Sequence, residues 1–181
     1  ADSIKAGLVL APEDRKKDGL CTRLSIADNI ALPNLDILCE GPVGTVNRKK
    51  EKAMVDNAVK ALKIKLPNAQ VDAGSLSGGN QQKVVIAKWL LTEPDILIMD
   101  EPTRGIDAGA RTDVYNIIKG LSKKGLAVLL ISSDMEEIIE LSDRAVTIHQ
   151  GRLNCEFDRA DINQENLTKA SFGVIGKEKE S

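Results

Sequence analysis

Aromatic side chains are scarce in this chain of 181 residues, which contains one Trp, one Tyr and two Phe. Its charges nearly balance, since 25 Lys and Arg face 27 Asp and Glu and give a formal net charge of −2. Proteins that coat DNA or RNA carry a basic surface, and those that bind single strands add aromatic rings on which bases stack. The composition therefore argues against nucleic acid as a partner.

Long apolar runs and paired cysteines are missing as well. The longest apolar run, residues 126–131, has six residues, whereas a membrane-spanning helix needs roughly 20. Cys21, Cys39 and Cys155 form no C-x-x-C pair and have no zinc-binding spacing to the single His149. We therefore predict reduced thiols of a cytosolic protein, with neither disulfides nor a zinc site, and a His149 side chain that simply packs.

Apolar residues make up 42% of the chain, which is enough for one globular core. Apolar segments of strand and helix type alternate along the sequence, as is typical of an α/β fold with a parallel sheet. The four consecutive apolar residues at 96–99 predict a strand that is covered on both faces. Residues 33–46, with two prolines and two glycines, predict a loop. We expect strands at 7–11, 96–99, 126–132, 144–149 and 153–157, and helices at 25–32, 48–65, 83–91, 109–124, 134–141 and 161–173.

Charged residues mark two further segments. Residues 12–19, PEDRKKDG, predict a solvated turn, and residues 176–181, GKEKES, predict a frayed end. Leu167 and Phe172 are the expected apolar anchors of the last helix.

A glycine turn opens the predicted helix at 83–91. It reads LSGGNQQ from Leu76 to Gln82 and places Gly78 and Gly79 after Ser77. A helix that begins in this way directs unpaired backbone N–H groups and the positive end of its dipole outward, and glycine allows an anion to approach closely. These residues predict a phosphate-binding turn. A serine-capped helix after a loop explains the same residues, and the two glycines alone do not decide between these interpretations.

Two acidic residues follow the apolar segment 96–99. In a parallel sheet, Asp100 would lie at the carboxyl end of its strand, where such folds place their sites. There Asp100 is suited to hold a hydrated Mg²⁺ ion, and Glu101 to orient or deprotonate a water that attacks a terminal phosphate. An ordinary strand exit before Pro102 is the alternative. The fixed order of the glycine turn and the acid pair, about 20 residues apart, is more specific than either motif alone.

Together these motifs resemble those of a known family. LSGGNQQK followed by ILIMDEPTRGID is similar to the signature motif, Walker B motif and D-loop of an ATP-binding-cassette (ABC) ATPase. NQQ after the glycines and PTRGIDAGAR after the acids resemble the second cassette of the tandem ATPases that drive bacterial importers of ribose, galactose and xylose, with their autoinducer-2 relatives. The resemblance covers about residues 7–157.

The resemblance implies an α/β fold of the P-loop NTPase type, with an ABC-cassette core of mostly parallel strands and an inserted helical subdomain. The sequence contains no G-x-x-x-x-G-K-[ST], so the P-loop and the N-terminal β-subdomain are missing from these residues. The first residues, ADSIKAG, lack the features of a signal peptide. We therefore expect a fragment that cannot hydrolyse ATP alone. Its expected parts are a core strand and Q-loop-like region at 1–24, the helical subdomain at 25–75, the signature, Walker B, D-loop and switch region at 76–157, and a C-terminal helix and tail at 158–181.

The resemblance also implies ATP and Mg²⁺ as cofactors and assigns roles to individual residues. Asp100 is the expected magnesium ligand and Glu101 the catalytic residue that acts on water. Ser133 stands where most such ATPases have a histidine that contacts the γ-phosphate, which implies slow hydrolysis at that site; a simple helix start explains Ser133 equally well. Glu13 occupies the place of the Q-loop glutamine. The expected nucleotide-binding residues are Ser77, Gly78, Gly79, Asn80, Gln81, Asp107 and Glu13.

The implied partners are a second cassette, transmembrane permease subunits and, indirectly, an external sugar-binding protein. The location would be the cytoplasmic face of the bacterial inner membrane. Because such cassettes pair head to tail, we expect the chain to act mainly on ATP held by its partner. Two other functions share these motifs: an ABC-type ATPase that works on nucleic acid or ribosomes, and a docking module without catalysis. The transported molecule is not encoded in these residues.

Overall fold

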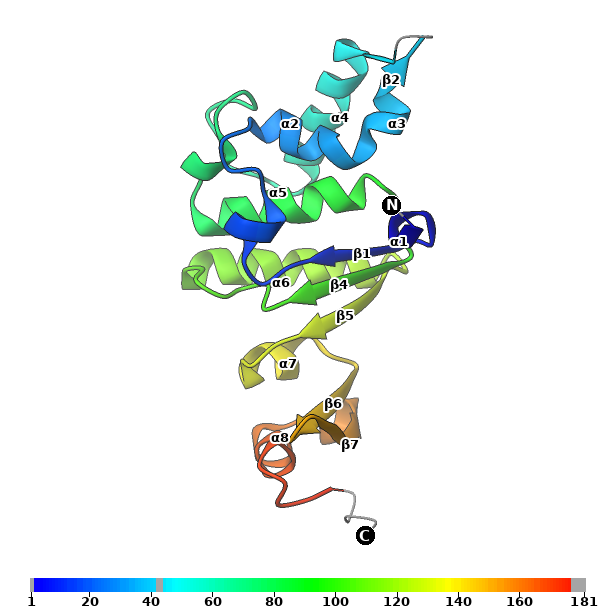
Figure 1. Cartoon of the computed structure of the whole chain (residues 1–181). Coiled ribbons are helices and arrows are strands. Elements are labelled where there is room, and N and C mark those ends of the chain that lie inside the picture. Colours follow the sequence, from blue (N-terminus) through cyan, green and yellow to red (C-terminus); the bar gives the residue numbers. More distant parts are fainter. Residues whose placement is uncertain (1, 42–43, 177–181) are drawn as a thin grey trace. The chain divides into compact units, whose positions relative to one another are not determined.

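A computed structural model describes residues 2–41 and 44–176 of the protein (Figure 1). The chain forms two compact units, one ending at Ile131 and the other beginning at Ser132. This boundary falls inside the region 76–157 that the sequence treats as one functional segment. The first unit contains the glycine turn and the acid pair, and the second contains Ser133.

The first unit is built on a parallel sheet of three strands, in the order β1 (Leu8–Ala11), β4 (Ile96–Asp100) and β5 (Ala127–Ile131). The register pairs Leu8 with Ile96, and Asp100 with Ile131. The three strands predicted at 7–11, 96–99 and 126–132 are thus confirmed, and they run parallel as the alternating pattern indicated. Two parallel strands need a crossover connection between them, and that connection is usually a helix.

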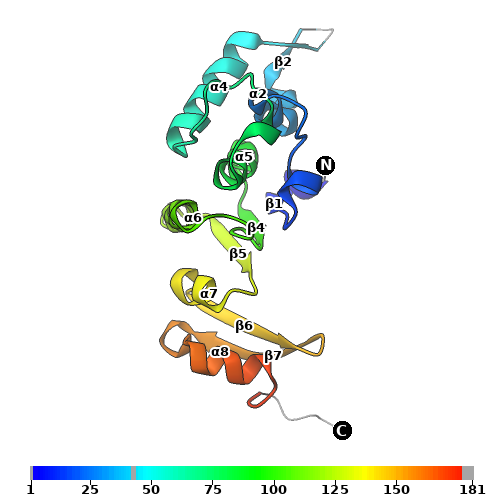
Figure 2. The same ribbon diagram turned by 90° about the vertical axis from the view of Figure 1, so that its left-hand side faces the viewer.

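Two helices cover one face of this sheet: α5 (Gly78–Leu90) and α6 (Ala108–Ser122), which Figure 2 shows on the same side. Leu97 and Met99 point to this face and are fully buried, whereas Ile96 is 42% and Leu129 is 53% exposed. The prediction of a strand covered on both faces is therefore wrong within this unit. Both helices pack on the same side, and strand side chains alternate between faces, so every second residue stays uncovered.

A mainly helical part precedes α5. It contains α2 (Ile26–Ala31), α3 (Leu35–Leu38) and α4 (Arg48–Ala61), with 3-10 turns at Leu32–Asn34 and Ala73–Ser75 and a hairpin of β2 (Cys39–Glu40) and β3 (Thr45–Val46). The loop predicted at 33–46 is therefore partly regular structure, although residues 42–43 lie outside the described ones. Gly41 and Gly44 have positive φ values of 75° and 65°, which explains why glycines flank the hairpin turn.

The N-terminal segments frame the first strand. Helix α1 (Asp2–Lys5) leads into β1, and the predicted turn at 12–19 forms a short π-helical turn, Arg15–Gly19. The Asp14 carboxylate accepts from the backbone N–H groups of Lys16 and Lys17 at 3.0 and 3.1 Å, which begins this turn. The segment is therefore more ordered than a solvated loop.

The second unit contains α7 (Met135–Leu141), β6 (Arg144–His149), β7 (Arg152–Asp158), a 3-10 turn at Arg159–Asp161 and α8 (Gln164–Ser171). β6 and β7 form an antiparallel hairpin. Leu167 is buried in a core with Ala145 and Ile162, as predicted for an anchor. Phe172 is 73% exposed, because α8 ends one residue earlier, so the prediction of a second anchor is wrong. The predicted frayed end begins at Gly176, and residues 177–181 lie outside the described ones.

The cysteines and the histidine make no covalent link among the described residues. Cys21, Cys39 and Cys155 are free thiols, and His149 Nδ1 lies 2.9 Å from the Ser171 carbonyl oxygen, a structural contact. Every helix in residues 2–41 and 44–176 is too short or too polar to cross a lipid bilayer.

Candidate functional site

The acid pair lies where the sequence places it, at the carboxyl end of a parallel strand. Asp100 is the last residue of β4 and is half-buried opposite Ile131 of β5. The backbone N–H of Glu101 donates to the Ile131 carbonyl at 2.8 Å, which continues the pairing by one residue. Both carboxyl groups therefore sit at the edge of the sheet where α/β folds place their ligands.

Glu101 adopts a backbone conformation that is unusual for its residue type. Its φ is +45°, in the left-handed region that costs a residue with a side chain about 1 kcal/mol or more. The following turn fixes this conformation, because the Arg104 N–H donates to the Glu101 carbonyl at 3.1 Å and the Ile106 N–H to the Thr103 carbonyl at 3.2 Å. Strained residues of this kind gather at functional sites, which supports the role predicted for Glu101.

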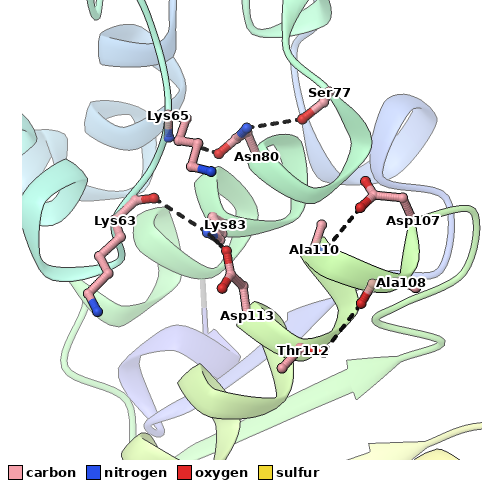
Figure 3. Close-up of polar contacts among 10 residues, drawn as sticks. All are labelled: Lys63, Lys65, Ser77, Asn80, Lys83, Asp107, Ala108, Ala110, Thr112 and Asp113. Atoms are coloured by element: carbon pink, nitrogen blue, oxygen red, sulfur yellow. Dashed lines mark hydrogen bonds and ion pairs between the residues drawn. The ribbon is translucent and has the colours of Figure 1, made fainter.

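The same turn delivers Asp107 to the start of α6. The Asp107 carboxylate accepts from the Ala110 N–H at 3.0 Å and caps the helix, as Figure 3 shows. The residue is exposed. The cap fixes the carboxylate at the helix end, and the predicted role of Asp107 at an interface with a second cassette stays a prediction.

Ser77 begins α5 and is exposed. Its hydroxyl does not cap the helix, and instead accepts from Asn80 Nδ2 at 3.0 Å. Asn80 Oδ1 in turn accepts from the backbone N–H of Lys65 at 2.8 Å, so the amide bridges the turn after α4 to the signature serine (Figure 3). This arrangement directs the amide of Asn80 toward Ser77, and the predicted contact of Asn80 with nucleotide stays a prediction.

The two signature glycines are explained by packing. A Cβ atom on Gly79 would lie closer than 3.0 Å to Ala110 Cβ of α6, a distance that real Cβ atoms do not show. A Cβ atom on Gly78 would lie 3.1 Å from the Gly105 carbonyl oxygen and 2.6 Å from Arg15 Nη2. Gly79 is buried and Gly78 half-buried. The glycines therefore bring the starts of α5 and α6 together, a requirement that neither interpretation of the sequence included, and their predicted contact with nucleotide stays a prediction.

Gln81 is predicted among the nucleotide-binding residues, and that role stays a prediction. In the structure its side chain is only 1% exposed. Its amide donates to the Leu76 carbonyl at 3.0 Å and the Gly74 carbonyl at 3.3 Å. Gln81 lies on the inner side of α5, one position after the half-exposed Asn80, so its amide holds the preceding loop in shape.

Sequence reasoning missed Lys83, which joins three segments. Its side chain is 4% exposed, and its ammonium group lies 2.7 Å from the Asp113 carboxylate of α6 and 3.4 Å from the Lys63 carbonyl after α4 (Figure 3). The hydrogen bond from Lys83 holds the pKa of Asp113 below its ordinary range. A lysine directly before the apolar run VVIA was the available signal, because a buried charge needs a partner.

The charged segment 12–19 also reaches this region. Glu13 is exposed and forms an ion pair with Arg104. Arg15 Nη1 donates to the Arg104 carbonyl at 2.8 Å, and Nη2 to the Gly105 carbonyl at 3.3 Å. Arg15 was not among the residues predicted from the sequence. The contacts of Glu13 are with protein, and its predicted contact with nucleotide stays a prediction.

Ser133 belongs to the second unit and is exposed just before α7. The next residue, Asp134, is the N-cap of α7 and accepts from the Glu136 N–H at 3.0 Å. Ser133 is thus at a helix start, as the simpler interpretation required, and its catalytic role stays a prediction.

A magnesium site at Asp100 agrees with the ligand chemistry of this ion. Mg²⁺ in proteins is usually held by one or two carboxylates together with waters and substrate phosphates. Within residues 2–41 and 44–176, no three His, Cys, Asp or Glu side chains gather into a metal-binding group. A half-exposed aspartate at a strand end fits the role of a single carboxylate ligand, and the ion would supply charge neutralisation for a phosphate.

Relatives of known role match nearly the whole chain. It is 42% identical over 173 residues to the ribose import ATP-binding protein of Yersinia pestis, covering 96% of this chain and 34% of that protein. It is 46% identical over 173 residues to the xylose import ATP-binding protein of Thermoanaerobacter pseudethanolicus, with the same coverage of 96% and 34%. The chain thus spans about a third of the length of these relatives.

Solved structures share the fold. A nucleotide-free ATP-binding cassette from an ABC transporter superposes with a TM-score of 0.74 at 24% identity, over 97% of this chain and 71% of that one. The dimeric cassette MJ0796, in a post-hydrolysis state bound to ADP and Pi, gives a TM-score of 0.69 at 20% identity, over 87% of this chain and 66% of that one. The family model for the ABC transporter matches residues 3–104, more than half of the chain. This chain therefore belongs to the ABC transporter family and has the α/β fold of an ATP-binding cassette.

Proposed function

We propose that the chain is the C-terminal part of the second ATP-binding cassette of a bacterial sugar importer, and that it acts mainly by completing a nucleotide site on a partner cassette. The observation that carries this proposal is the signature turn. Ser77 is exposed at the start of a 13-residue helix, and its hydroxyl is held by Asn80. The names of the relatives, which import ribose and xylose, support the substrate class.

Electrostatics favour a phosphate at this turn. The first N–H groups of α5 have no acceptor within the helix, and the helix dipole adds partial positive charge at the same end. Because Asn80 Nδ2 donates to the Ser77 oxygen, the hydroxyl proton of Ser77 is left to donate outward. These 181 residues contain no P-loop, so the β- and γ-phosphates would be held chiefly by the other cassette.

The acid pair gives the chain a second role at its own nucleotide site. Asp100 would ligate Mg²⁺, which neutralises phosphate charge when bound, and Glu101 would orient or deprotonate the attacking water. Ser133 would donate a hydrogen bond where most such ATPases have histidine. Serine is shorter and carries no positive charge, so this site would be the slower one. The two nucleotide sites would therefore differ: the signature turn would complete the partner's site fully, whereas hydrolysis at the chain's own site would be slow.

The partners follow from this role. The permease would lie against the helical subdomain at 25–75 and the segment 12–19 at the cytoplasmic face of the membrane, with the external sugar-binding protein on the far side. Asp107 would contact the second cassette. Nucleic acid is not among the proposed partners.

Sugar uptake and ATPase activity of the full-length protein with its permease test the asymmetry. Ser77→Arg places a bulky side chain at the signature turn, Glu101→Gln removes the acid, and Ser3→Arg on the exposed surface of α1 is the control. We expect uptake to fall most with Ser77→Arg, whereas Glu101→Gln should cost less than the roughly 10²- to 10⁴-fold typical of an essential general base. Equal losses would refute the asymmetry. ATPase activity that survives the double variant Ser77→Arg/Glu101→Gln would instead indicate a docking module.

A further inference from the structure

Arg15 touches two functional segments of the chain at once. Its guanidinium donates to the carbonyls of two consecutive residues, Arg104 at 2.8 Å and Gly105 at 3.3 Å, in the turn between Glu101 and Asp107. The same Nη2 atom lies close to Gly78, where an added Cβ would be 2.6 Å from it. One side chain therefore contacts both the D-loop turn and the start of the signature helix, at the point where these two segments approach each other.

The backbone that carries Arg15 is itself fixed to α5. The π-helical turn Arg15–Gly19 is capped by Asp14, and the Lys88 ammonium group of α5 donates to the Gly19 carbonyl. A Cβ on Gly19 would lie 3.2 Å from Val85 Cγ2, which shows how closely this turn approaches the helix. The turn that carries Arg15 is thus packed on α5, and the Arg15 side chain reaches from it to the D-loop turn.

The chemistry of the side chain suits this role. Burial lowers the pKa of the Arg15 guanidinium, which means that the charge has been partly removed from water. Carbonyl oxygens compensate for this desolvation, and the planar fork of arginine can serve two of them together. Lysine has a single ammonium group on a flexible stem and cannot reproduce the fork at the same spacing.

We propose that Arg15 is a positioning residue that sets the distance between the D-loop turn and the start of α5, and thereby presents Ser77 and Asp107 together to a second cassette. This inference rests on the proposed function. Arg15 does not touch nucleotide in this proposal. It acts through Ser77 and Asp107, the residues that directly precede two helices packed together at Gly79 and Ala110.

The test measures the ATPase activity and melting temperature of the full-length protein with its permease. Arg15→Ala removes both hydrogen bonds, and Arg15→Lys keeps the charge without the fork. Lys5→Ala is the control, because Lys5 is exposed in α1, outside the segments proposed to contact the permease. We expect kcat to fall about 10- to 100-fold with Arg15→Ala, on the scale of lost hydrogen bonds to a charged group. The kcat of Arg15→Lys should lie between those of Arg15→Ala and the wild type. Lys5→Ala should match the wild type, and the melting temperatures of all three variants should be nearly unchanged.

A double variant separates positioning from a general structural effect. If Arg15 acts through the signature serine, Ser77→Ala should lower kcat much less in the Arg15→Ala background than in the wild type. The inference would be overturned if the fold-reductions in kcat of the two single variants simply multiplied in the double variant. It would also be overturned if kcat fell only in step with the melting temperature. So would wild-type activity of Arg15→Ala while Ser77→Arg is inactive, a result that leaves the proposed function intact. Full activity of Ser77→Arg would instead refute the proposed function itself.

Discussion

Replacing Gly79 with alanine tests how closely α5 and α6 approach each other. The added methyl group would lie less than 3.0 Å from Ala110 Cβ, whereas carbon atoms are most stable about 3.5–4.0 Å apart. The helices would have to separate by roughly 1 Å or deform locally. Overpacking of this kind typically costs about 1–3 kcal/mol. Alanine regains about 1 kcal/mol of helix propensity over glycine, so we expect a net loss of up to about 2 kcal/mol.

Gly120 of α6 provides the matched control, because an added Cβ there meets nothing within 4 Å. Gly120→Ala should stabilise the protein by about 0.5–1 kcal/mol through helix propensity alone. The double variant Gly79→Ala/Ala110→Gly moves the methyl group from one helix to the other. Its free energy of unfolding should exceed, by about 1 kcal/mol, the value expected from adding the changes of the two single variants. Urea unfolding of the full-length protein, followed by circular dichroism, gives these differences.

One result would refute this reasoning: a Gly79→Ala variant that is stabilised as much as Gly120→Ala. The glycine would then not be required for helix packing. If such a variant also lost ATPase activity, the requirement would lie in the approach of an anion, as the sequence alone suggested. The two explanations of Gly79 therefore give opposite signs for the change in stability.

Three further predictions concern polar groups in this region. Asn80→Asp loses the donor to the Ser77 hydroxyl and should lower ATPase activity in steady-state assays at a nearly unchanged melting temperature; a wild-type rate would contradict the bridging role. Asp107→Ala should cost about 1 kcal/mol in urea unfolding as a lost cap, whereas Asp107→Asn should keep the cap; equal stability losses would contradict this. Asp113→Asn leaves the buried Lys83 without its counter-charge and should cost about 1–2 kcal/mol, a value reduced because the Asp113 side chain is 52% exposed. Because the pKa of Asp113 is lowered in the folded protein, its ion pair stabilises fully above about pH 4, and this stabilisation is lost as the pH falls through the lowered pKa. The free energy of unfolding of Asp113→Asn should therefore fall less steeply with acid than that of the wild type.

Local chemistry made much of the fold predictable from the sequence. The apolar runs at 7–11, 96–99 and 126–132 form the parallel strands, because short apolar runs that alternate with helices are typical of a parallel sheet. Asp100 and Glu101 follow a strand directly, so their place at its carboxyl end needed no knowledge of distant residues. The cap of α4 by Asn47 is equally local, since the residues that it joins are neighbours in the chain.

Sequence reasoning did not foresee the contacts that residues make with distant partners. Gln81 and Asn80 are adjacent, yet one faces the protein interior and the other bridges to Lys65, and only the packing of α5 decides which. The exposed face of the sheet at Ile96 likewise depends on where two helices settle, which strand periodicity does not specify.

The sequence by itself determined the order of the motifs, the parallel strands and the acids at a strand end, because each depends on neighbouring residues. The tertiary structure alone decided that Gly79 serves helix packing and that Arg15 joins the signature to the D-loop turn. The physical reason is separation along the chain: Arg15 and Arg104 are 89 residues apart, and a contact of that range is fixed only when the sheet and its two helices assemble.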